Sequence, residues 1–218
     1  KPFLNTNLIT NENDAMLVAD KIGYPILIRP SYVIGGKSME IVQTPKELDA
    51  YLKSQVQFDE HTNILIDKYF EGIECEVDAV SDNTDVLIPG IMEHIERAGV
   101  HSGDSIAIYP PLNLTKKEIE QIIEYTTKIT LGLKVTGLIN IQYVIIRNSN
   151  NSQYKNKTGS VYVIEANPRA SRTIPFISKI TTVPMVSLAL GTILGKSLKT
   201  LGYKGGLWEN SNKIIGIK

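Results

Sequence analysis

Glu165-Ala166-Asn167-Pro168-Arg169-Ala170-Ser171-Arg172 is the stretch from which the fold can be argued, and it follows directly on an apolar strand candidate. Glu165 and Asn167 stand two residues apart, so an extended chain turns both side chains to one face. One carboxylate and one amide oxygen suit Mg²⁺, which takes few protein oxygens and completes its octahedron with phosphate oxygens and water. Pro168 disfavours a helical conformation at the residue before it. The stretch therefore predicts a cation site at a strand end.

Two arginines and a glutamine extend this candidate site. Arg169 and Arg172 can each form paired hydrogen bonds with carboxylate or phosphate oxygens. Gln142 interrupts an otherwise apolar strand candidate, residues 138–146, and is either a core amide satisfied by a neighbour or a side chain that reaches a site. If this strand and the one before Glu165 form a hairpin, Gln142 and Glu165 would lie near each other on one face. The alternative is a polar strand end with two surface arginines.

A glycine loop is the second candidate feature. Arg29 follows a short apolar run, and Gly35-Gly36-Lys37 comes a few residues later. Glycine lets backbone N–H groups approach anionic oxygens, and the two cations would offset their charge, so the loop is a plausible phosphate cover. The spacing of a Walker A loop is absent. An ordinary hairpin turn with a surface lysine is the competing interpretation.

The third feature is a dense polar segment, residues 93–105, which holds two of the three histidines. It offers no cysteine partner and no histidine spacing typical of zinc. We expect His101 to donate a hydrogen bond to an anionic group, and Glu93 or Glu96 to accept one from a substrate. The chain contains no Ser–His–Asp or Cys–His set for covalent catalysis, which fits phosphoryl transfer by positioning and positive charge.

The composition of the whole chain limits the class of protein and the kinds of partner that we expect. The 218 residues carry 23 basic and 23 acidic side chains, so the zero net charge predicts no nucleic-acid or anionic-membrane partner. No apolar run approaches the roughly 20 residues that span a bilayer. The single cysteine, Cys75, suits a reducing compartment, and we expect a cytoplasmic protein. The first residues lack the pattern of a signal peptide and are interpreted as a cut inside a longer protein.

Hydrophobic periodicity and capping signals predict a mixed, partly antiparallel α+β fold. Thr44 with Glu47, and Thr115 with Glu118, form the pattern of capping boxes. Residues 148–160, rich in Asn, Ser and Lys, are expected to form a lengthened hairpin loop. We expect helices at 11–22, 44–55, 115–131 and 183–194, and strands at 26–28, 39–42, 63–67, 74–80, 86–95, 138–146 and 161–164.

Taken together, these motifs resemble the large subunit of carbamoyl phosphate synthetase over residues 10–200. The His101-Ser102-Gly103-Asp104-Ser105 segment is the most specific part, whereas the Glu-x-Asn-Pro-Arg pattern is shared with biotin carboxylases. The matching stretches are Gly23-Tyr24-Pro25, Arg29-Pro30-Ser31-Tyr32-Val33-Ile34-Gly35-Gly36, Ile91-Met92-Glu93-His94-Ile95-Glu96, Gly99-Val100-His101-Ser102-Gly103-Asp104-Ser105, and Glu165 to Arg172.

The resemblance implies an ATP-grasp fold, with two α+β lobes and the nucleotide between them. It implies a small lobe with the glycine loop over residues 1–85, a large lobe with the metal site over 86–202, and a tail toward another domain over 203–218. In this family one half of the large subunit phosphorylates bicarbonate and the other phosphorylates carbamate. Ile91-Met92-Glu93-His94 and Thr173-Ile174-Pro175-Phe176 resemble the carbamate half.

The resemblance also implies residue roles. Two Mg²⁺ or Mn²⁺ ions would be bound by Gln142, Glu165 and Asn167, and the catalytic residues would be Arg169, Arg172 and His101. A K⁺ ion would lie near Glu74, His94, Glu96 and Ser105. Contacts with ATP would come from Arg29, Gly35, Gly36, Lys68, Glu74, Gly99, Val100, His101, Ser102, Gln142 and Glu165.

The implied partners are ATP and carbamate, a glutaminase domain or small subunit, and other domains of the large subunit. Some relatives are mitochondrial, and the pathway is either arginine or pyrimidine synthesis. The alternatives are the bicarbonate-phosphorylating half, another ATP-grasp carboxylate ligase, and an ATP-binding module that turns nothing over.

Overall fold

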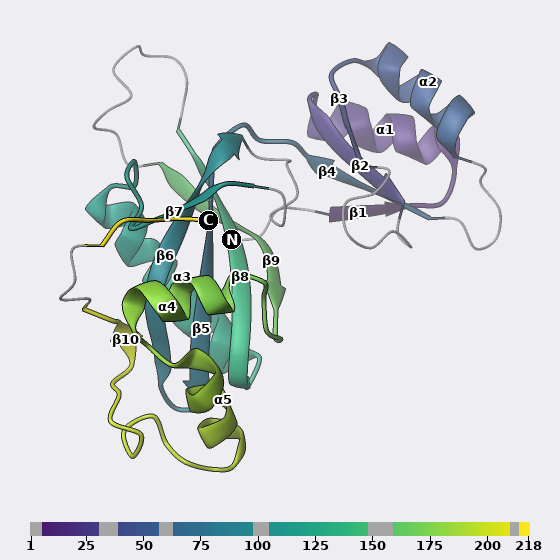
Figure 1. The fold of residues 1–218 in the computed structure, drawn as a ribbon. Coiled ribbons are helices and arrows are strands. Elements are labelled where there is room, and N and C mark those ends of the chain that lie inside the picture. The colour runs from purple at the N-terminus through teal and green to yellow at the C-terminus, as the bar shows by residue number, and fades with distance from the viewer. Residues whose placement is uncertain (1–5, 31–38, 57–62, 98–104, 148–158, 210–213) are drawn as a thin grey trace. The chain divides into compact units, whose positions relative to one another are not determined.

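The computed structural model describes residues 6–30, 39–56, 63–97, 105–147, 159–209 and 214–218, which fall into two compact units (Figure 1). We call residues 6–71 the N-terminal lobe and Gly72–Lys218 the C-terminal lobe. The sequence predicted a boundary after residue 85. The structural division comes earlier, because the strand Ile73–Asp82 pairs on both sides with strands of the C-terminal lobe.

The N-terminal lobe is an antiparallel sheet with two helices on one face. Its core is formed by Ile26, Ile28, Leu48, Ile64 and Ile66, which are fully buried between the sheet and the helices. The strands follow the order β1-β4-β2-β3. The elements are β1 (Thr6–Ile9), α1 (Glu12–Ile22), β2 (Ile26–Pro30), β3 (Glu40–Val42), α2 (Pro45–Gln55) and β4 (Ile64–Lys68).

Local capping explains where three helices begin. The side chain of Thr44 accepts a hydrogen bond from the Glu47 N–H at 3.3 Å, at the start of α2. Thr115 and Glu118 complete a reciprocal capping box, with a Thr115 N–H to Glu118 Oε2 distance of 2.7 Å. Asn11 caps the start of α1, and Gly23 caps its end with a φ of +76°, a conformation that suits glycine.

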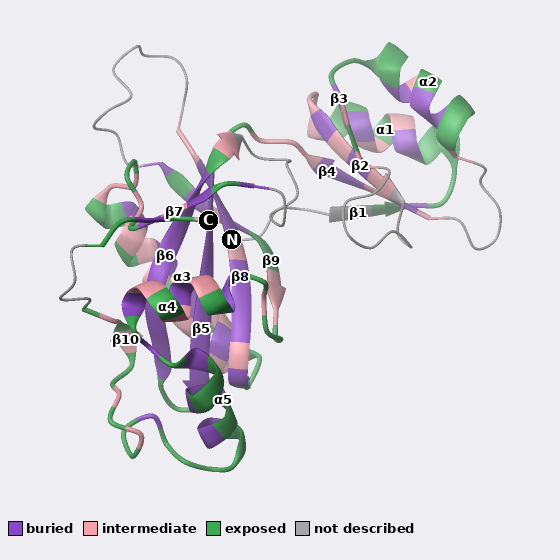
Figure 2. Cartoon of the chain, in the orientation of Figure 1, coloured by how far each residue is buried: buried purple, intermediate pink, exposed green. Residues whose placement is uncertain are grey.

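The C-terminal lobe is built on a larger sheet with the strand order β11-β7-β6-β5-β8-β9, and β10 pairs with β6. One face is covered by α3 and the other by α4 and α5. Figure 2 shows β5, β6 and β8 buried over most of their length. The elements are β5 (Ile73–Asp82), β6 (Val86–Arg97), β7 (Ala107–Tyr109), α3 (Lys116–Gly132), β8 (Thr136–Ile146), β9 (Ser160–Asn167), α4 (Ile174–Thr181), α5 (Met185–Ile193), β10 (Gly206–Leu207) and β11 (Gly216–Ile217).

Residues 203–218 differ from the expected tail. Gly206 pairs with Leu87, and Gly216 pairs with Tyr109, so the described part of this segment adds two short strands to the sheet.

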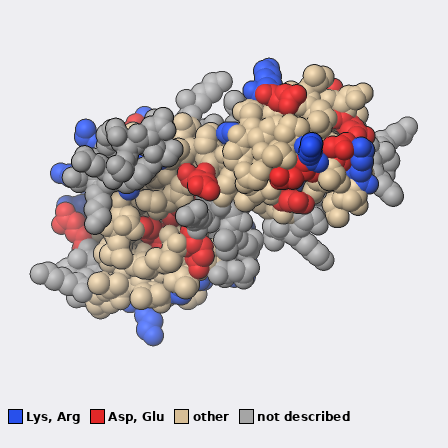
Figure 3. Space-filling model, turned by 90° about the horizontal axis from the view of Figure 1, so that it is seen from above, with Lys and Arg blue, Asp and Glu red and all other residues tan. Residues whose placement is uncertain are grey.

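No single described helix is long and apolar enough to cross a bilayer, although α4 and α5, bent by 108°, pass such a test as a pair. Ile177 and Met185 of these helices are fully buried in the lobe's core. On the face in Figure 3, acidic and basic side chains occur on both lobes.

Candidate functional site

The two faces of the C-terminal sheet have different chemistry. Along β5, Cys75, Val77 and Ala79 pack in the core under α3, whereas Glu74, Glu76 and Asp78 alternate with them, as the sequence predicted. Burial raises the pKa of the Cys75 thiol well above its usual value, which fits a core residue rather than a nucleophile. The three acidic residues therefore define a polar face opposite α3.

The predicted hairpin of β8 and β9 places two site candidates opposite each other. Gln142 pairs with Glu165, and Asn140 pairs with Asn167, so all four side chains lie on the polar face. Tyr143 pairs with Val163, which leaves Ile164 as an extra residue in β9. This β-bulge turns Glu165 to the polar face, although Val163, two residues earlier, lies in the core under α3.

The oxygen atoms of this hairpin fit a hard divalent cation. Glu165 is exposed, Gln142 and Asn167 are half-buried, and Asn167 Nδ2 donates to Glu165 Oε1 at 2.8 Å. Carboxylate and amide oxygens are ligands that Mg²⁺ and Mn²⁺ accept. Among the described residues no three His, Cys, Asp or Glu side chains form a metal-binding group. The predicted set has one carboxylate, so phosphate oxygens of a nucleotide would have to complete the coordination.

The segment after β9 carries the two predicted arginines, and both are exposed. The Arg169 N–H donates to the Asn167 carbonyl at 2.8 Å, so the chain turns tightly at Pro168. Arg169 Nη1 also donates to the Ala170 carbonyl at 3.0 Å. We refer to residues 168–173 as the arginine loop.

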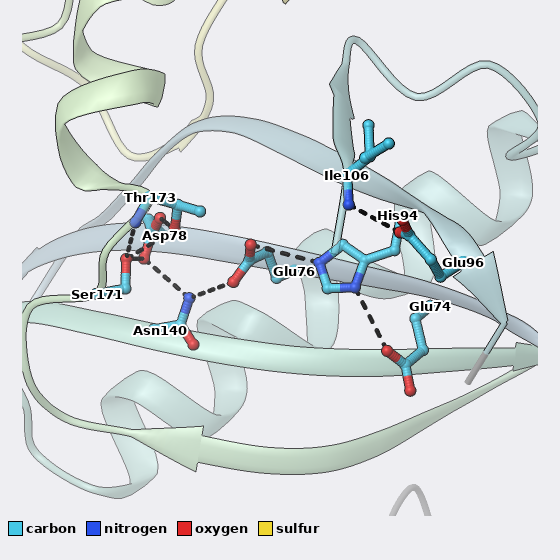
Figure 4. Close-up of polar contacts among 9 residues, drawn as sticks. All are labelled: Glu74, Glu76, Asp78, His94, Glu96, Ile106, Asn140, Ser171 and Thr173. Atoms are coloured by element: carbon cyan, nitrogen blue, oxygen red, sulfur yellow. Dashed lines mark hydrogen bonds and ion pairs between the residues drawn. The ribbon is translucent and has the colours of Figure 1, made fainter. Parts of the chain in front are cut away.

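Asp78 holds the end of the arginine loop, a role that the sequence did not reveal (Figure 4). Its Oδ1 accepts from Ser171 Oγ at 2.6 Å, and its Oδ2 accepts from Thr173 Oγ1 at 2.5 Å. Asn140 Nδ2 donates to Oδ1 at 2.9 Å. Burial raises the pKa of Asp78, and these hydrogen bonds act in the opposite direction. The alternation along β5 indicated a polar face, but not these partners.

A buried histidine lies between two carboxylates on the same face. His94 Nδ1 lies 3.4 Å from Glu74 Oε2, and Nε2 lies 3.4 Å from Glu76 Oε1 (Figure 4). Burial lowers the pKa of His94, but the hydrogen bonds and charges of the two glutamates outweigh it and raise the pKa to about 9. At neutral pH His94 is therefore an imidazolium ion. Asn140 Nδ2 also donates to Glu76 at 3.2 Å, which links this trio to Asp78.

The glutamates of the polar segment have structural partners. Glu93 pairs across the sheet with Cys75, on the α3 face, and its carboxylate accepts from the N–H groups of Leu112 and Asn113 at 2.8 Å. Glu93 is therefore not a substrate acceptor on the polar face. Glu96 Oε2 accepts from the Ile106 N–H at 2.8 Å, and the adjacent Ser105 is buried.

In the N-terminal lobe, the two basic residues predicted to contact ATP, Arg29 and Lys68, lie on the adjoining antiparallel strands β2 and β4. Arg29 Nη2 lies 3.7 Å from Asp67 Oδ2, and Arg29 Nε has no hydrogen-bond partner among the described residues. Lys68 donates to the carbonyls of Gly23 and Tyr24 at 2.8 and 2.9 Å, and burial lowers its pKa. The predicted residues Gly35, Gly36, Gly99, Val100, His101 and Ser102 lie outside the described residues. So do residues 148–158 of the expected hairpin loop 148–160, whose last residue, Ser160, begins β9.

Comparison with known proteins gives a family and a fold. Residues 4–201 match the family model described as carbamoyl-phosphate synthase L chain, ATP binding domain. The biotin carboxylase domain of the Hydrogenobacter thermophilus 2-oxoglutarate carboxylase, solved with MgADP, ADP and bicarbonate, superposes at TM-score 0.71 and 20% identity. The biotin carboxylase of Campylobacter jejuni, in a β-γ-ATP complex, superposes at TM-score 0.72 and 16% identity.

The alignments cover 94% and 93% of this chain, but 44% and 45% of those two structures. The chain therefore spans less than half of their length. At such low identity the likeness concerns the fold alone, and it confirms the expected α+β ATP-grasp architecture.

Proposed function

The chain belongs to the family of the carbamoyl-phosphate synthase L chain ATP-binding domain, and from this we propose that it phosphorylates carbamate with ATP as part of a larger synthetase. The single observation that carries the proposal is the pairing of Gln142 with Glu165 beside the arginine loop. This arrangement joins oxygen donors for a nucleotide-bound cation to guanidinium groups for an anionic substrate. ATP would be a substrate of an ATP-dependent ligase.

Mg²⁺ or Mn²⁺ would be held by Glu165, Asn167 and Gln142, and when bound would supply positive charge to the phosphate oxygens. The amide of Asn167 donates to Glu165 in this structure, so it would have to rotate to present its oxygen to the ion. The exposure of Glu165 leaves its carboxylate accessible to a metal–nucleotide complex. A K⁺ ion would lie near Glu74, His94, Glu96 and Ser105.

The substrate chemistry needs orientation more than proton transfer. A carbamate oxygen is already anionic and can attack the γ-phosphorus in line, while the bond from that phosphorus to the β,γ-bridging oxygen breaks and ADP leaves. Arg169 and Arg172 would orient carbamate and offset the charge of the transferring phosphoryl group. Arg29 and Lys68 would contact ATP, and Glu74 would contact its ribose hydroxyls.

The remaining parts of the synthetase belong to the same proposal. Carbamate formation requires ammonia, which a glutaminase domain or small subunit would supply, and other domains of the large subunit would complete the reaction sequence. The second candidate is the phosphorylation of bicarbonate, the reaction of the other half of the family's large subunit. The Hydrogenobacter thermophilus domain, with which this chain shares the fold, was solved with bicarbonate and MgADP. The two candidates predict different responses to the same substitution.

The test uses Glu165→Gln in the full-length enzyme that contains this chain. Wild type and variant are compared in ATP formation from carbamoyl phosphate and Mg·ADP, and separately in bicarbonate-dependent ATP hydrolysis. We expect ATP formation to fall by about 10²-fold or more, because the only carboxylate of the proposed metal site is neutralised. Bicarbonate-dependent hydrolysis should persist, since the proposal assigns that reaction to a different half of the enzyme.

The matched control is Glu120→Gln, which makes the same chemical change at an exposed position of α3. It should leave both activities unchanged. Loss of bicarbonate-dependent hydrolysis with ATP formation retained would make this chain the bicarbonate half. Full retention of both activities in Glu165→Gln would contradict the metal-site assignment, and nucleotide binding without either activity in wild type would indicate a binding module.

A further inference from the structure

We propose that Asp78 is a positioning residue that holds Arg172 in place for the anionic substrate; this inference rests on the proposed function. Arg172 stands between Ser171 and Thr173, and the hydroxyl groups of both neighbours donate to the one carboxylate of Asp78. The backbone of Arg172 is thus anchored on both sides, while its side chain remains exposed.

The anchor is rigid because it is buried and fully engaged. Asp78 is 0% exposed and Thr173 is 2% exposed. Ser171 Oγ also accepts from the Thr173 N–H at 3.2 Å, which closes a small ring of hydrogen bonds with Asp78 at the start of α4. A buried carboxylate is costly unless it is hydrogen-bonded, so departure of either hydroxyl would be opposed by the free energy of an unsatisfied charge.

Asp78 also relates the arginine loop to the strand with the proposed metal ligands. Asn140 donates to Asp78 and stands opposite Asn167 in the β8–β9 pairing. One buried carboxylate therefore anchors the loop that carries Arg172, and through Asn140 contacts the strand next to Asn167. Reacting groups need this kind of mutual placement, since displacement by about 1 Å can cost about 10²-fold in rate.

The experiment measures the back-reaction of the full-length enzyme for Asp78→Asn, Ser171→Ala and Thr173→Val. Asp78→Asn replaces one acceptor oxygen by a donor, and Thr173→Val removes a donor while keeping the side-chain shape. We expect kcat/KM for carbamoyl phosphate to fall by about 10²-fold in Asp78→Asn and by about 10-fold in each single hydroxyl variant. The KM for Mg·ADP should change by less than about 2-fold.

A lower kcat/KM for carbamoyl phosphate with a nearly unchanged KM for Mg·ADP distinguishes a positioning role from general destabilisation. Thr192→Val is the matched control, because Thr192 is 3% exposed and donates to the Ala189 carbonyl in α5, away from the arginine loop. It should keep the wild-type kcat/KM. Thr173→Ser restores the hydroxyl and should recover most of the activity lost in Thr173→Val. If Asp78→Asn does not fold, the two hydroxyl variants and the rescue carry the test.

Unchanged kcat/KM for carbamoyl phosphate in Thr173→Val and Ser171→Ala would overturn the positioning role. Equal losses for carbamoyl phosphate and Mg·ADP, accompanied by a lower Tm and no rescue by Thr173→Ser, would also overturn it. Failure of the proposed function has a different signature: Glu165→Gln keeps the back-reaction and loses bicarbonate-dependent ATP hydrolysis instead. In that case the variants are compared in kcat/KM for bicarbonate and in the KM for the nucleotide. An enzyme with neither activity overturns both proposals.

Discussion

Replacing His94 by glutamine tests whether a buried imidazolium stabilises the C-terminal lobe. His94 is 4% exposed, and its two ring nitrogens each lie 3.4 Å from a carboxylate oxygen, one of Glu74 and one of Glu76. Its pKa of about 9 exceeds the ordinary value of 6.5 despite burial. Folding therefore favours the protonated form of this histidine.

The sign and size of the effect follow from that difference. A group whose pKa is raised by folding contributes stability that is fully present below pH 6.5 and is lost as the pH rises through about 9. Each pH unit corresponds to about 1.4 kcal/mol, so the contribution is about 3 kcal/mol. This is a large part of the 5–15 kcal/mol that is typical of a folded domain, given as an order of magnitude.

Urea unfolding from about pH 6 to about pH 10 measures this contribution in wild type and in His94→Gln. The free energy of unfolding of wild type should fall relative to the variant by about 3 kcal/mol across that range. Groups that titrate in both proteins cancel in the comparison, and burial raises the pKa of Tyr143, which keeps the Tyr143 phenol neutral in that range. Glu76→Gln, which removes one carboxylate, should move the decline to lower pH. Parallel profiles for wild type and His94→Gln would refute the reasoning.

Two further predictions concern a buried ion pair and a close packing contact in the C-terminal lobe. Glu118 is fully buried and accepts from Arg147 at 2.7 and 3.1 Å and from the Gly159 N–H at 2.6 Å, so Glu118→Gln should lower the free energy of urea unfolding by about 3–5 kcal/mol. Burial raises the pKa of Glu118, but these hydrogen bonds outweigh it and lower the pKa overall. The contribution of the ionised carboxylate to stability is therefore present above pH 4.5 and is lost as the pH falls through the pKa in the folded state. If the stabilities of wild type and Glu118→Gln differed by the same amount at every acidic pH, this reasoning would be wrong. Gly90→Ala should lower the free energy of unfolding by about 1–3 kcal/mol, because an added Cβ would meet the Tyr109 ring. The control is Gly132→Ala in α3, where an added Cβ meets nothing within 4 Å and should not destabilise the protein. Equal Tm values for the two glycine variants would count against the packing argument.

The sequence predicted the elements whose signals are local. Capping signals need only residues within one turn, and Thr44 and Thr115 each accept from an N–H in the first turn of α2 and α3. Thr115 and Glu118 form the complete capping box, whereas the Glu47 carboxylate accepts from the Gln43 N–H instead. The short strands β1, β7, β10 and β11 were missed, because two to four residues become a strand only through their partners. The helix α4 was also missed, because its start at Thr173 has no side-chain cap and is held instead by Asp78.

In the candidate site, too, the sequence predicted contacts between segments close in the chain but not contacts between distant residues. The hairpin of β8 and β9 could be inferred from two nearby apolar runs, so the pairing of Gln142 with Glu165 was expected. Asp78 could not be inferred, because its partner Thr173 lies 95 positions away in the chain. Glu93 was misplaced for another reason: successive residues of a strand face opposite sides, and only the register with Cys75 shows which side Glu93 takes.

The bulge at Ile164 changes which face of the sheet the odd-numbered residues of β9 occupy. Before the bulge the odd-numbered residues Val161 and Val163 face α3, and after it the odd-numbered residues Glu165 and Asn167 face away from α3. In a strictly alternating strand, a shift of one residue would exchange every core position with every site position. Here one supernumerary residue separates the two sets, so the half of the strand that packs under α3 ends where the half that bears the proposed ligands begins.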